Sequence, residues 1–554
     1  MFLIQEKRKR GTHLCIVQSY RDPVSKKTRK KRIRNLGYLE DLKQLYDDPV
    51  AYFTEEAQRM SREHSAGVST SSIAVQTSKR LRTDTAYIKN YGYAALAAIY
   101  HSLKLDIFLR TKAREQDLGN NLHHIVKMYV YGAFIFPDTI NRMYDKRSRL
   151  FEKTDFPLDE VFRSLSGLLR SKTQLQGWIH ENVCHVYGRK RGQAYYYISN
   201  HYFEVPEQDR VRLDGSQKGY RMDPIVRMGL FVDEARIPIS YELLSDSAGK
   251  GEAFVIPPAV RHRAEKYGIE KITVVADTNF GSAMALYPIR AAGDDYIISP
   301  SIRDAGKEMK EYVIQNNGWK TYGDDCRIKS RISTKRIQVT NAAGKKESVS
   351  FEERQIVYYN PVHARWARAE REGTLLRVKD FLSSPGILGS ASPFGLTQKT
   401  QREIEAEMLE EEKYDGYYLI LTNRLDDDDE TIFGIYRDLW DIQSFCRMKD
   451  NTFEAHPKYF SRREIMQTHY LVCYIALILV RILEQKTEHR YALNQIIRSL
   501  KKCNCVYVEE NYFVRTYFDE ILDCIGKYTN IDFSKKYLTL GNIRKSLGLS
   551  SSKT

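Results

Sequence analysis

The sequence predicts a mixed α/β fold whose sheet-forming part lies between helical regions. Short apolar segments bounded by turn residues alternate with helix-like segments between residues 195 and 292. Residues 91–186 place apolar side chains three to four positions apart, a spacing typical of helices packed on a core. Residues 431–449 and 465–484 have the length and apolar content of two further long helices.

The composition describes a folded, basic protein. The chain has 554 residues, of which 42% are apolar and 12% aromatic, and this excludes a disordered chain. Its length suffices for two to four domains. The formal net charge of +16 favours a polyanionic partner such as nucleic acid, although a merely soluble basic protein would share it.

The cysteines and the apolar segments exclude several classes of protein. The eight cysteines form no CxxC pair and no spacing typical of metal ligands, so we expect ordinary thiols in a reduced compartment. The longest apolar run, 470–480, is too short to cross a bilayer and predicts a core helix without membrane contact. Charged residues at 6–10 occupy the place of the apolar segment of a signal peptide.

Residues 1–60 predict a small β-containing basic module, followed by a linker rich in Ser and Thr at 61–80. Two strands are expected, near 13–19 and 33–39, with a dense basic run between them. Such a run can neutralise several phosphates, so we expect DNA contact, with a solvated hairpin loop as the alternative. The expected DNA-binding residues are Lys26, Lys27, Arg29, Lys30, Lys31, Arg32 and Arg34.

The remaining elements follow in order. Residues 81–190 predict a helical domain, with clear helical spacing at 94–99 and 158–169. Residues 191–300 predict strands at 195–203, 229–233, 237–242 and 272–277 and helices at 253–267 and 282–292. Residues 301–413 are β-rich, with a hairpin turn at 341–344 and a charged helix at 365–379. Residues 414–490 contain a strand at 417–422 and the two long helices, and residues 491–554 are expected to be helical.

Asp277 is the leading candidate for chemistry. It ends the apolar run 272–276, so a buried strand would deliver its carboxylate to the strand tip. Phosphoryl transfer by two metal ions needs carboxylates from separate elements to meet at one such point. Read alone, Asp277 could equally cap a turn at the end of a strand.

Several blocks in a defined order resemble the DDE transposases of bacterial insertion sequences, in the branch with a β-rich insertion. Residues 195–204 resemble the first strand of that family, and 221–230 with 237–242 resemble the second and third. Residues 274–277 resemble the strand that ends in the second catalytic Asp. Residues 436–449 resemble the signature helix, which carries the catalytic Glu. The resemblance implies an RNase H-like catalytic core, formed by 191–300 and 414–490 and interrupted by the insertion 301–413.

The resemblance also assigns the positions of the three catalytic carboxylates. Tyr197 stands where the family has its first Asp, Asp277 is the second Asp, and Gln443 stands where the family has Glu. Asp277 is therefore the one expected carboxylate that this chain retains. A phenol is neutral at pH 7 and an amide carries no charge, so such a site should bind Mg²⁺ or Mn²⁺ poorly.

The signature helix departs from the family pattern at further positions. Tyr436 matches, but Leu439 replaces an Arg, and Lys449 lies one place before the family's Lys. That place holds Asp450, and Thr278 follows Asp277 where the family usually has Arg.

Three other acids are weak replacements for the missing carboxylates. Glu204 lies seven residues after position 197, which puts it on the opposite face of a regular strand. Asp441 lies roughly 200° around the helix from Gln443, and Asp450 lies about 10 Å further along it.

The resemblance implies metal-dependent DNA cleavage and strand transfer with Mg²⁺ or Mn²⁺. The implied partners are double-stranded DNA, both element ends and target, and a second copy of the chain. The implied location is the bacterial cytoplasm, at the nucleoid. Because two carboxylates are replaced, we expect weak or absent cleavage. The hypotheses are an active transposase, a transposase-derived DNA-binding or regulatory protein without catalysis, and a host nuclease on the same fold.

Overall fold

A computed structural model of the chain forms two compact units, Met1–Leu81 and Arg82–Thr554. It describes residues 1–8, 11–21, 28–43, 46–65, 80, 87–201, 203–204, 226–244, 256–277, 283–323, 325–340, 346–369, 409–410, 412–446, 448–449, 462–509 and 511–549. The predicted turn at 341–344, most of the predicted helix 365–379 and residues 221–225 of the resembling block lie outside these ranges, as do Thr278 and Asp450.

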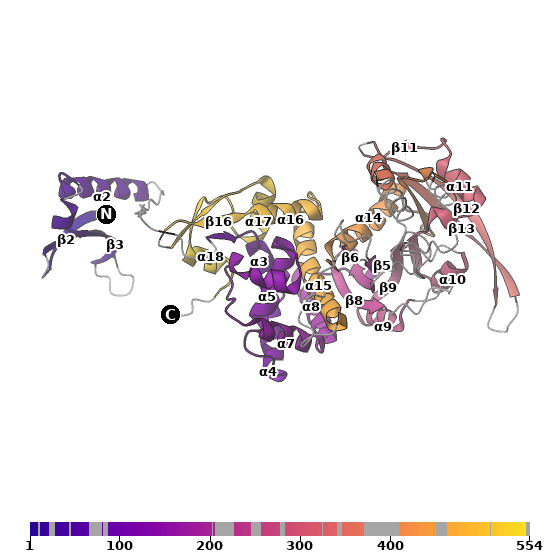
Figure 1. The fold of residues 1–554 in the computed structure, drawn as a ribbon, viewed down its shortest axis with the longest axis horizontal. Helices are drawn as coiled ribbons and strands as arrows, with labels where there is room; N and C mark the ends of the chain where they lie inside the picture. The colour runs from indigo at the N-terminus through magenta and orange to yellow at the C-terminus, as the bar shows by residue number, and fades with distance from the viewer. Residues whose placement is uncertain are drawn as a thin grey trace, which may run out of the picture. The chain divides into compact units, whose positions relative to one another are not determined.

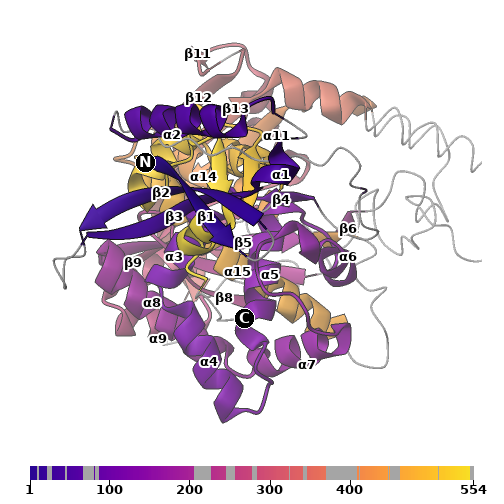
Figure 2. The ribbon, with the colours of Figure 1, turned by 90° about the vertical axis from the view of Figure 1, so that its left-hand side faces the viewer.

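The N-terminal unit is a three-stranded antiparallel sheet covered on one face by a helix (Figure 2). Its elements are β1 (Phe2–Arg8), β2 (Gly11–Arg21), β3 (Thr28–Tyr38), α1 (Leu39–Leu42) and α2 (Pro49–Ser65). The two predicted strands are present as β2 and β3, whereas β1 and α2 were not predicted. Leu14, Leu42 and Phe53 form the small core between sheet and helix. Residues 61–65 of the predicted linker belong to α2, and 66–79 lie outside the described residues.

The basic run differs from the expected loop. Its described part, from Thr28 onward, lies on strand β3 and pairs with β2. β-Bulges at two points shift the register of this pairing. Each bulge interrupts the regular alternation of side chains between the two faces of the sheet.

The larger unit is built on a nine-stranded sheet with the order β11-β12-β13-β14-β10-β9-β5-β7-β8. The strands are β5 (Gly192–His201), β7 (Val226–Asp233), β8 (Pro238–Leu244), β9 (Ile269–Asp277), β10 (Asp295–Ser299), β11 (Lys320–Thr321), β12 (Arg327–Thr340), β13 (Lys346–Tyr359) and β14 (Tyr417–Thr422). Consecutive strands β5, β7 and β8 pair antiparallel, and β9 and β10 run parallel to β5. The mixed α/β prediction is confirmed, and the described strands of the β-rich segment extend the same sheet instead of forming a separate one.

Helices cover both faces of this sheet. One face packs on α9 (Pro258–Lys266), α10 (Ala283–Ala291) and α11 (Lys307–Ile314), with a short 3₁₀ turn η2 (Ile302–Asp304) beside them. The other face packs on α14 (Asp429–Phe445). Strands buried on both faces read as continuous apolar runs, which is why these strands were visible in the sequence.

The predicted signature helix is shorter than expected. It ends at Phe445, and Met448–Lys449 forms a strand, β15, that pairs in parallel with β6 (Phe203–Glu204). The assignment of Lys449 to the helix is therefore wrong. Its backbone is held by a strand more than two hundred residues earlier, and a local helical pattern cannot reveal such a partner.

A helical group surrounds the long helix α15 (Arg462–Lys486) (Figure 1). The other helices are α3 (Ala94–Ser102), α4 (Leu105–Glu115), α5 (Leu122–Ile135), α6 (Ile140–Asp145), η1 (Arg147–Arg149), α7 (Leu158–Leu169) and α8 (Lys172–Tyr187). By length and composition α15 could cross a membrane, but 83% of its most apolar window is buried inside the protein. It is the core helix that the apolar run predicted.

The C-terminal region is not purely helical, so that prediction is corrected. It contains α16 (Leu493–Lys502), α17 (Glu520–Thr529) and α18 (Leu540–Ser546), and also β16 (Asn504–Tyr507), β17 (Tyr512–Arg515) and β18 (Tyr537–Thr539). These strands form a four-stranded sheet with β4 (Ile88–Asn90), in the order β18-β17-β16-β4. Strands of three or four residues carry too little alternation to be recognised. Because β4 comes from the other end of the unit, regions 81–190 and 491–554 share one core.

Candidate functional site

The candidate site lies at the carboxyl end of β9. Ile272, Val274, Val275 and Ala276 are buried between the two helical layers, and Asp277 follows them, partly exposed, at the strand tip. The neighbouring strands β5 and β10 run parallel to β9, so all three present the same end there. Open α/β sheets typically bind ligands at this end of their parallel strands.

Helix α14 brings the second residue to the tip. Its N-cap is Asp428, whose carboxylate accepts from the Thr431 backbone N–H at 2.6 Å, and two further acids in the first turn suit the helix dipole. The acidic run 426–430 therefore includes the N-cap and the first turn of this helix. Ile432, Leu439 and Ile442 are buried, so the apolar stripe lies on the sheet and the last turn reaches β9.

Asp277 and Gln443 are in direct contact. The Nε2 amide of Gln443 donates to Oδ2 of Asp277 at 2.8 Å. This orientation of the amide is the favourable one, because a carboxylate accepts only and the amide oxygen would repel it. Two of the three positions that the resemblance assigned therefore converge, one from the sheet and one from the helix.

Tyr197 lies deeper, under α14. It is 1% exposed, and its hydroxyl donates to the Ile435 carbonyl at 3.2 Å and lies 3.5 Å from Oδ2 of Asp438. Burial, followed by the charge of Asp438, raises the pKa of the Tyr197 hydroxyl well above its usual value, so this side chain is neutral. Tyr197 pairs with Val275, which places it two residues before the level of Asp277.

Serine residues stand at that level on both neighbouring strands. Ser299 of β10 pairs with Asp277, and Ser199 follows the last β5 pair, that of Ile198 with Ala276. The sequence analysis missed both serines. Ser299 ends an apolar strand run in the same way as Asp277, so the same signal could have revealed it.

The remaining signature positions belong to the core. Tyr436 is buried, and burial together with the charge of Asp277 raises the pKa of its hydroxyl. Leu439 is fully buried, so the residue that stands for the family's Arg makes apolar contacts. Lys449 lies on β15, and the structure does not describe its side chain.

Asp438 of α14 lies at a second, buried site. Asp438 is 2.9 Å from Nε of Arg236 and 3.5 Å from Arg481, and Arg481 is 2.6 Å from Glu484. We call Asp438, Arg236, Arg481 and Glu484 the buried ion cluster. Burial raises the pKa of Asp438 to about 6, against the opposing effect of Arg481 and Arg236. Asp438 lies roughly 140° around the helix from Gln443, so its carboxylate faces away from the tip of β9.

Of the other candidate acids, the structure describes the side chain of Asp441 alone, and that side chain lies away from the tip site. Burial also raises the pKa of Asp441, and the charge of Arg481 opposes that effect, which places Asp441 beside the buried ion cluster. For Glu204 the structure describes the backbone on β6 alone, and Asp450 lies outside the described residues.

Aromatic side chains border α14. Trp440 packs on Tyr418 at 5.1 Å, on Tyr436 at 5.6 Å and on His363 at 5.6 Å, measured between ring centroids. The ring of His363 stacks on Trp366, which is 67% exposed. Trp440 is thus a packing residue.

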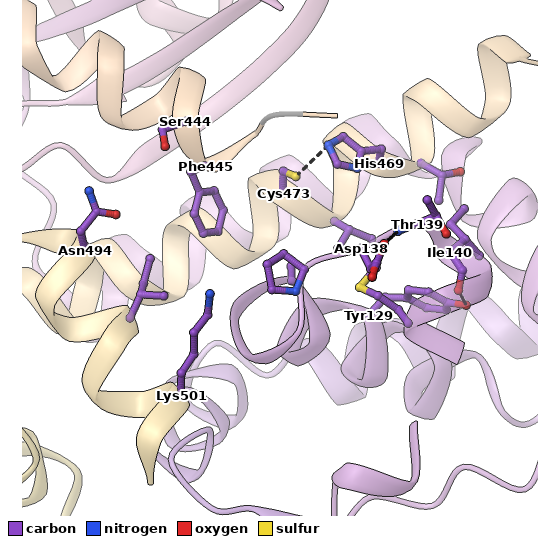
Figure 3. Close-up of a pocket in the computed structure, with 16 residues that line it drawn as sticks. Tyr129, Asp138, Thr139, Ile140, Ser444, Phe445, His469, Cys473, Asn494 and Lys501 are labelled. Carbon is purple, nitrogen blue, oxygen red and sulfur yellow. Dashed lines mark hydrogen bonds between the residues drawn. The ribbon is translucent and has the colours of Figure 1, made fainter. Parts of the chain in front are cut away.

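A cavity of about 350 Å³ lies beside the last turn of α14 (Figure 3). Phe445 lines it, together with His469 and Cys473 of α15, whose Nε2 and Sγ atoms are 3.5 Å apart. A hydrogen bond with Cys446 is the main cause that lowers the pKa of the Cys473 thiol to about 5. Asp277 and Gln443 do not line this cavity, so it is separate from the tip site.

The basic strand β3 is the candidate DNA surface. Lys30, Lys31 and Arg32 are exposed, whereas Arg34 is half-buried and pairs with Glu56 of α2 at 2.9 Å. Arg32 also pairs with Glu6 of β1 at 2.5 Å. Lys26 and Lys27 lie outside the described residues, and the structure describes the backbone of Arg29 without its side chain.

Comparison with known proteins supports the resemblance. Residues 4–71 match the family model of the N-terminal domain of IS1634 family transposases. This match confirms the predicted relation to insertion-sequence transposases. No curated protein matches the chain. Among solved structures, a cryo-EM structure of the piggyBac transposase synaptic complex with hairpin DNA is similar at 8% identity and a TM-score of 0.28, over 79% of this chain and 77% of that one. A similarity this low assigns no fold to the chain.

Proposed function

We propose that this insertion-sequence transposase binds the ends of its element through double-stranded DNA contacts, and that its metal-dependent cleavage is weak or absent. The observation that carries the second part is the 2.8 Å hydrogen bond from Gln443 to Asp277. At the place where the resemblance expects a second acid, the chain supplies a hydrogen-bond donor to the first.

An RNase H-like core is part of this proposal. The strands matched to the first three of the family form the antiparallel series β5, β7, β8, and β9 then returns beside β5. Helix α14 follows the β-rich segment and lies on the same sheet. This arrangement supports a core in which a strand tip and a helix end meet, as two-metal phosphoryl transfer requires.

The residues present do not fit a pair of Mg²⁺ or Mn²⁺ ions. These cations prefer several oxygen ligands, with carboxylates to balance their charge. The tip offers the carboxylate of Asp277, but the Gln443 group that faces it is an NH₂ donor. The Tyr197 hydroxyl donates to the backbone of α14 and stays protonated. We therefore derive no metal-dependent step for the chain as it stands.

Binding to DNA rests on charge and on the N-terminal unit. The chain carries a net charge of +16, and β3 presents Lys30, Lys31 and Arg32 to solvent. Each phosphate contact releases counterions, so affinity should fall steeply with salt. We further propose that two copies act together on paired element ends, in the bacterial cytoplasm at the nucleoid. A DNA-binding regulator without catalysis is the form of this function that the tip site favours.

The test is nicking of supercoiled plasmid that carries the DNA flanking the gene, with Mg²⁺ or Mn²⁺. The natural chain is compared with Gln443→Glu combined with Tyr197→Asp, and with Gln443→Glu combined with Ser199→Asp. We expect no cleavage by the natural chain and metal-dependent cleavage by one restored pair. Adding Asp277→Ala to that pair should abolish it. Cleavage by the natural chain that disappears in Asp277→Ala would refute the impaired site.

DNA binding is tested with the same DNA, and its affinity is measured by fluorescence anisotropy at several salt concentrations. Replacing both Lys30 and Lys31 with Ala should weaken binding and lower the slope of log affinity against log salt by about 1–2. The matched control is Lys527→Ala, which removes an exposed Lys from α17. An unchanged slope in the double variant would show that β3 does not contact phosphate.

A further inference from the structure

The N-terminal unit brings together three side chains of the types that bind zinc. Glu6 of β1 pairs in register with His13 of β2, and Cys15 lies two residues further along β2. Residues two apart on a strand share a face, so all three point to the same side of the sheet. Leu14, which lies between His13 and Cys15, packs with Phe53 of α2. The cluster therefore lies on the face turned away from α2.

The three groups are close enough for one ion. A carboxylate oxygen of Glu6, a ring nitrogen of His13 and the sulfur of Cys15 all lie within 4.8 Å of one another. The Cys15 Sγ and Glu6 Oε1 atoms are 3.8 Å apart. Tetrahedral zinc with ordinary bond lengths needs ligand atoms about 3.4–3.6 Å apart. The sulfur–oxygen distance is thus close to that required, and the other two distances need to shorten by at most about 1.4 Å.

The cluster contains an unused ligand atom. His13 is 4% exposed, and its Nδ1 is buried without a hydrogen-bond partner among the described residues. A buried polar atom without a partner costs free energy, which a bound ion or water would recover.

We propose that Glu6, His13 and Cys15 form a zinc site that joins β1 to β2, with a water molecule as the fourth ligand. Sulfur, nitrogen and carboxylate ligands suit Zn²⁺ and do not suit Mg²⁺. On binding, the Cys15 thiol releases its proton to solvent. The resulting thiolate and the Glu6 carboxylate together balance the two charges of the ion.

Two arginines would compete with a zinc ion for the carboxylate of Glu6. Arg8 is 2.6 Å and Arg32 2.5 Å from the two carboxylate oxygens of Glu6. Zinc must displace at least one of them. Removing these arginines should therefore strengthen metal binding, whereas removing a ligand should weaken it.

The test uses Co²⁺ as a spectroscopic probe on the full-length chain, freed of metal with a chelator. Tetrahedral Co²⁺ bound to a thiolate gives intense visible bands and a sulfur-to-cobalt charge-transfer band. We expect one Co²⁺ per chain with both features, displaced by one equivalent of Zn²⁺ and unaffected by millimolar Mg²⁺. Cys15→Ser should remove the charge-transfer band, and Cys326→Ser, at another free cysteine, should leave it unchanged.

A variant that lacks both arginines gives a test that does not depend on whether Cys15→Ser folds. Arg8→Ala combined with Arg32→Ala should bind Co²⁺ about tenfold more tightly than the natural chain. Absence of the charge-transfer band in both the natural chain and this variant would overturn the proposal. A band that persists in Cys15→Ser would overturn it as well, because the sulfur ligand would then be another cysteine.

Discussion

Helix α14 carries two polar sites, and they neutralise charge in different ways. On its buried side, Asp438 meets the guanidinium groups of Arg236 and Arg481. At its last turn, Gln443 meets the single carboxylate of Asp277 through a neutral amide. At the first site, the positive charges of two guanidinium groups balance the carboxylate charge of Asp438. At the second site, the carboxylate of Asp277 accepts a hydrogen bond from a neutral amide.

The comparison gives a physical reason for the proposed loss of cleavage. A helix C-terminus carries partial negative charge, so a Glu at position 443 would meet both that dipole and Asp277. A bound cation would be needed to offset the repulsion. The amide of Gln443 removes the requirement, and this is the physical basis of the proposed loss of cleavage.

The largest effect is expected from breaking the buried ion cluster. Asp438→Ala should lower the free energy of unfolding by about 3–5 kcal/mol, because it leaves buried guanidinium charge without one of its partners. The measurement is the urea midpoint at constant m-value. Asp523→Ala, which removes an exposed pair with Lys527, should change the stability by less than about 1 kcal/mol. Equal effects of the two variants would show that the buried ion cluster contributes no more to stability than an exposed ion pair.

A smaller effect with a distinctive signature is expected at the tip. Gln443→Glu removes a donor from Asp277 and adds a like charge, so metal-free stability should fall by about 1–3 kcal/mol. Millimolar Mg²⁺ or Mn²⁺ should restore most of that loss, because two carboxylates can hold the ion. The uncharged variant Gln443→Met is the matched control, and its melting temperature should not respond to either ion. A metal response in the control would place the ion elsewhere.

The smallest effect is expected where the two sites approach one another. Tyr197→Phe removes the hydroxyl that donates to the Ile435 carbonyl and keeps the buried ring. The expected loss is about 1 kcal/mol, the net contribution of one hydrogen bond. DNA binding should stay unchanged, because the side chain is buried. A large change in DNA affinity at unchanged stability would instead assign Tyr197 to the functional surface.

The strands of the core were predictable because they are buried on both faces. β9 and β14 read as continuous apolar runs, and β14 begins and ends at the predicted residues. The long helices were predictable from apolar spacing over many turns. In the larger unit the errors fall on short elements with distant partners, whereas in the N-terminal unit β1 and the longer helix α2 were missed. β15 and β16 each depend on a strand hundreds of residues away, and so does the corrected position of Lys449.

The candidate residues divide in the same way. Asp277 and Gln443 were identified from the sequence as candidates, and the structure brings them together. Ser199 and Ser299 became visible only through the register of β5, β9 and β10. The cluster of Glu6, His13 and Cys15 was missed because cysteine spacing was the signal sought, and its ligands come from two paired strands.

By itself the sequence determined the family relation, the order of strands and helices in the core, and the chemistry of each candidate residue. These follow from residue identity and local periodicity, which need no knowledge of the fold. The tertiary structure alone decided that Gln443 donates to Asp277, that Tyr197 lies under α14, and that Asp438 of α14 belongs to the buried ion cluster. Contacts between residues far apart in the chain depend on strand register and helix packing, and no local pattern encodes either of them.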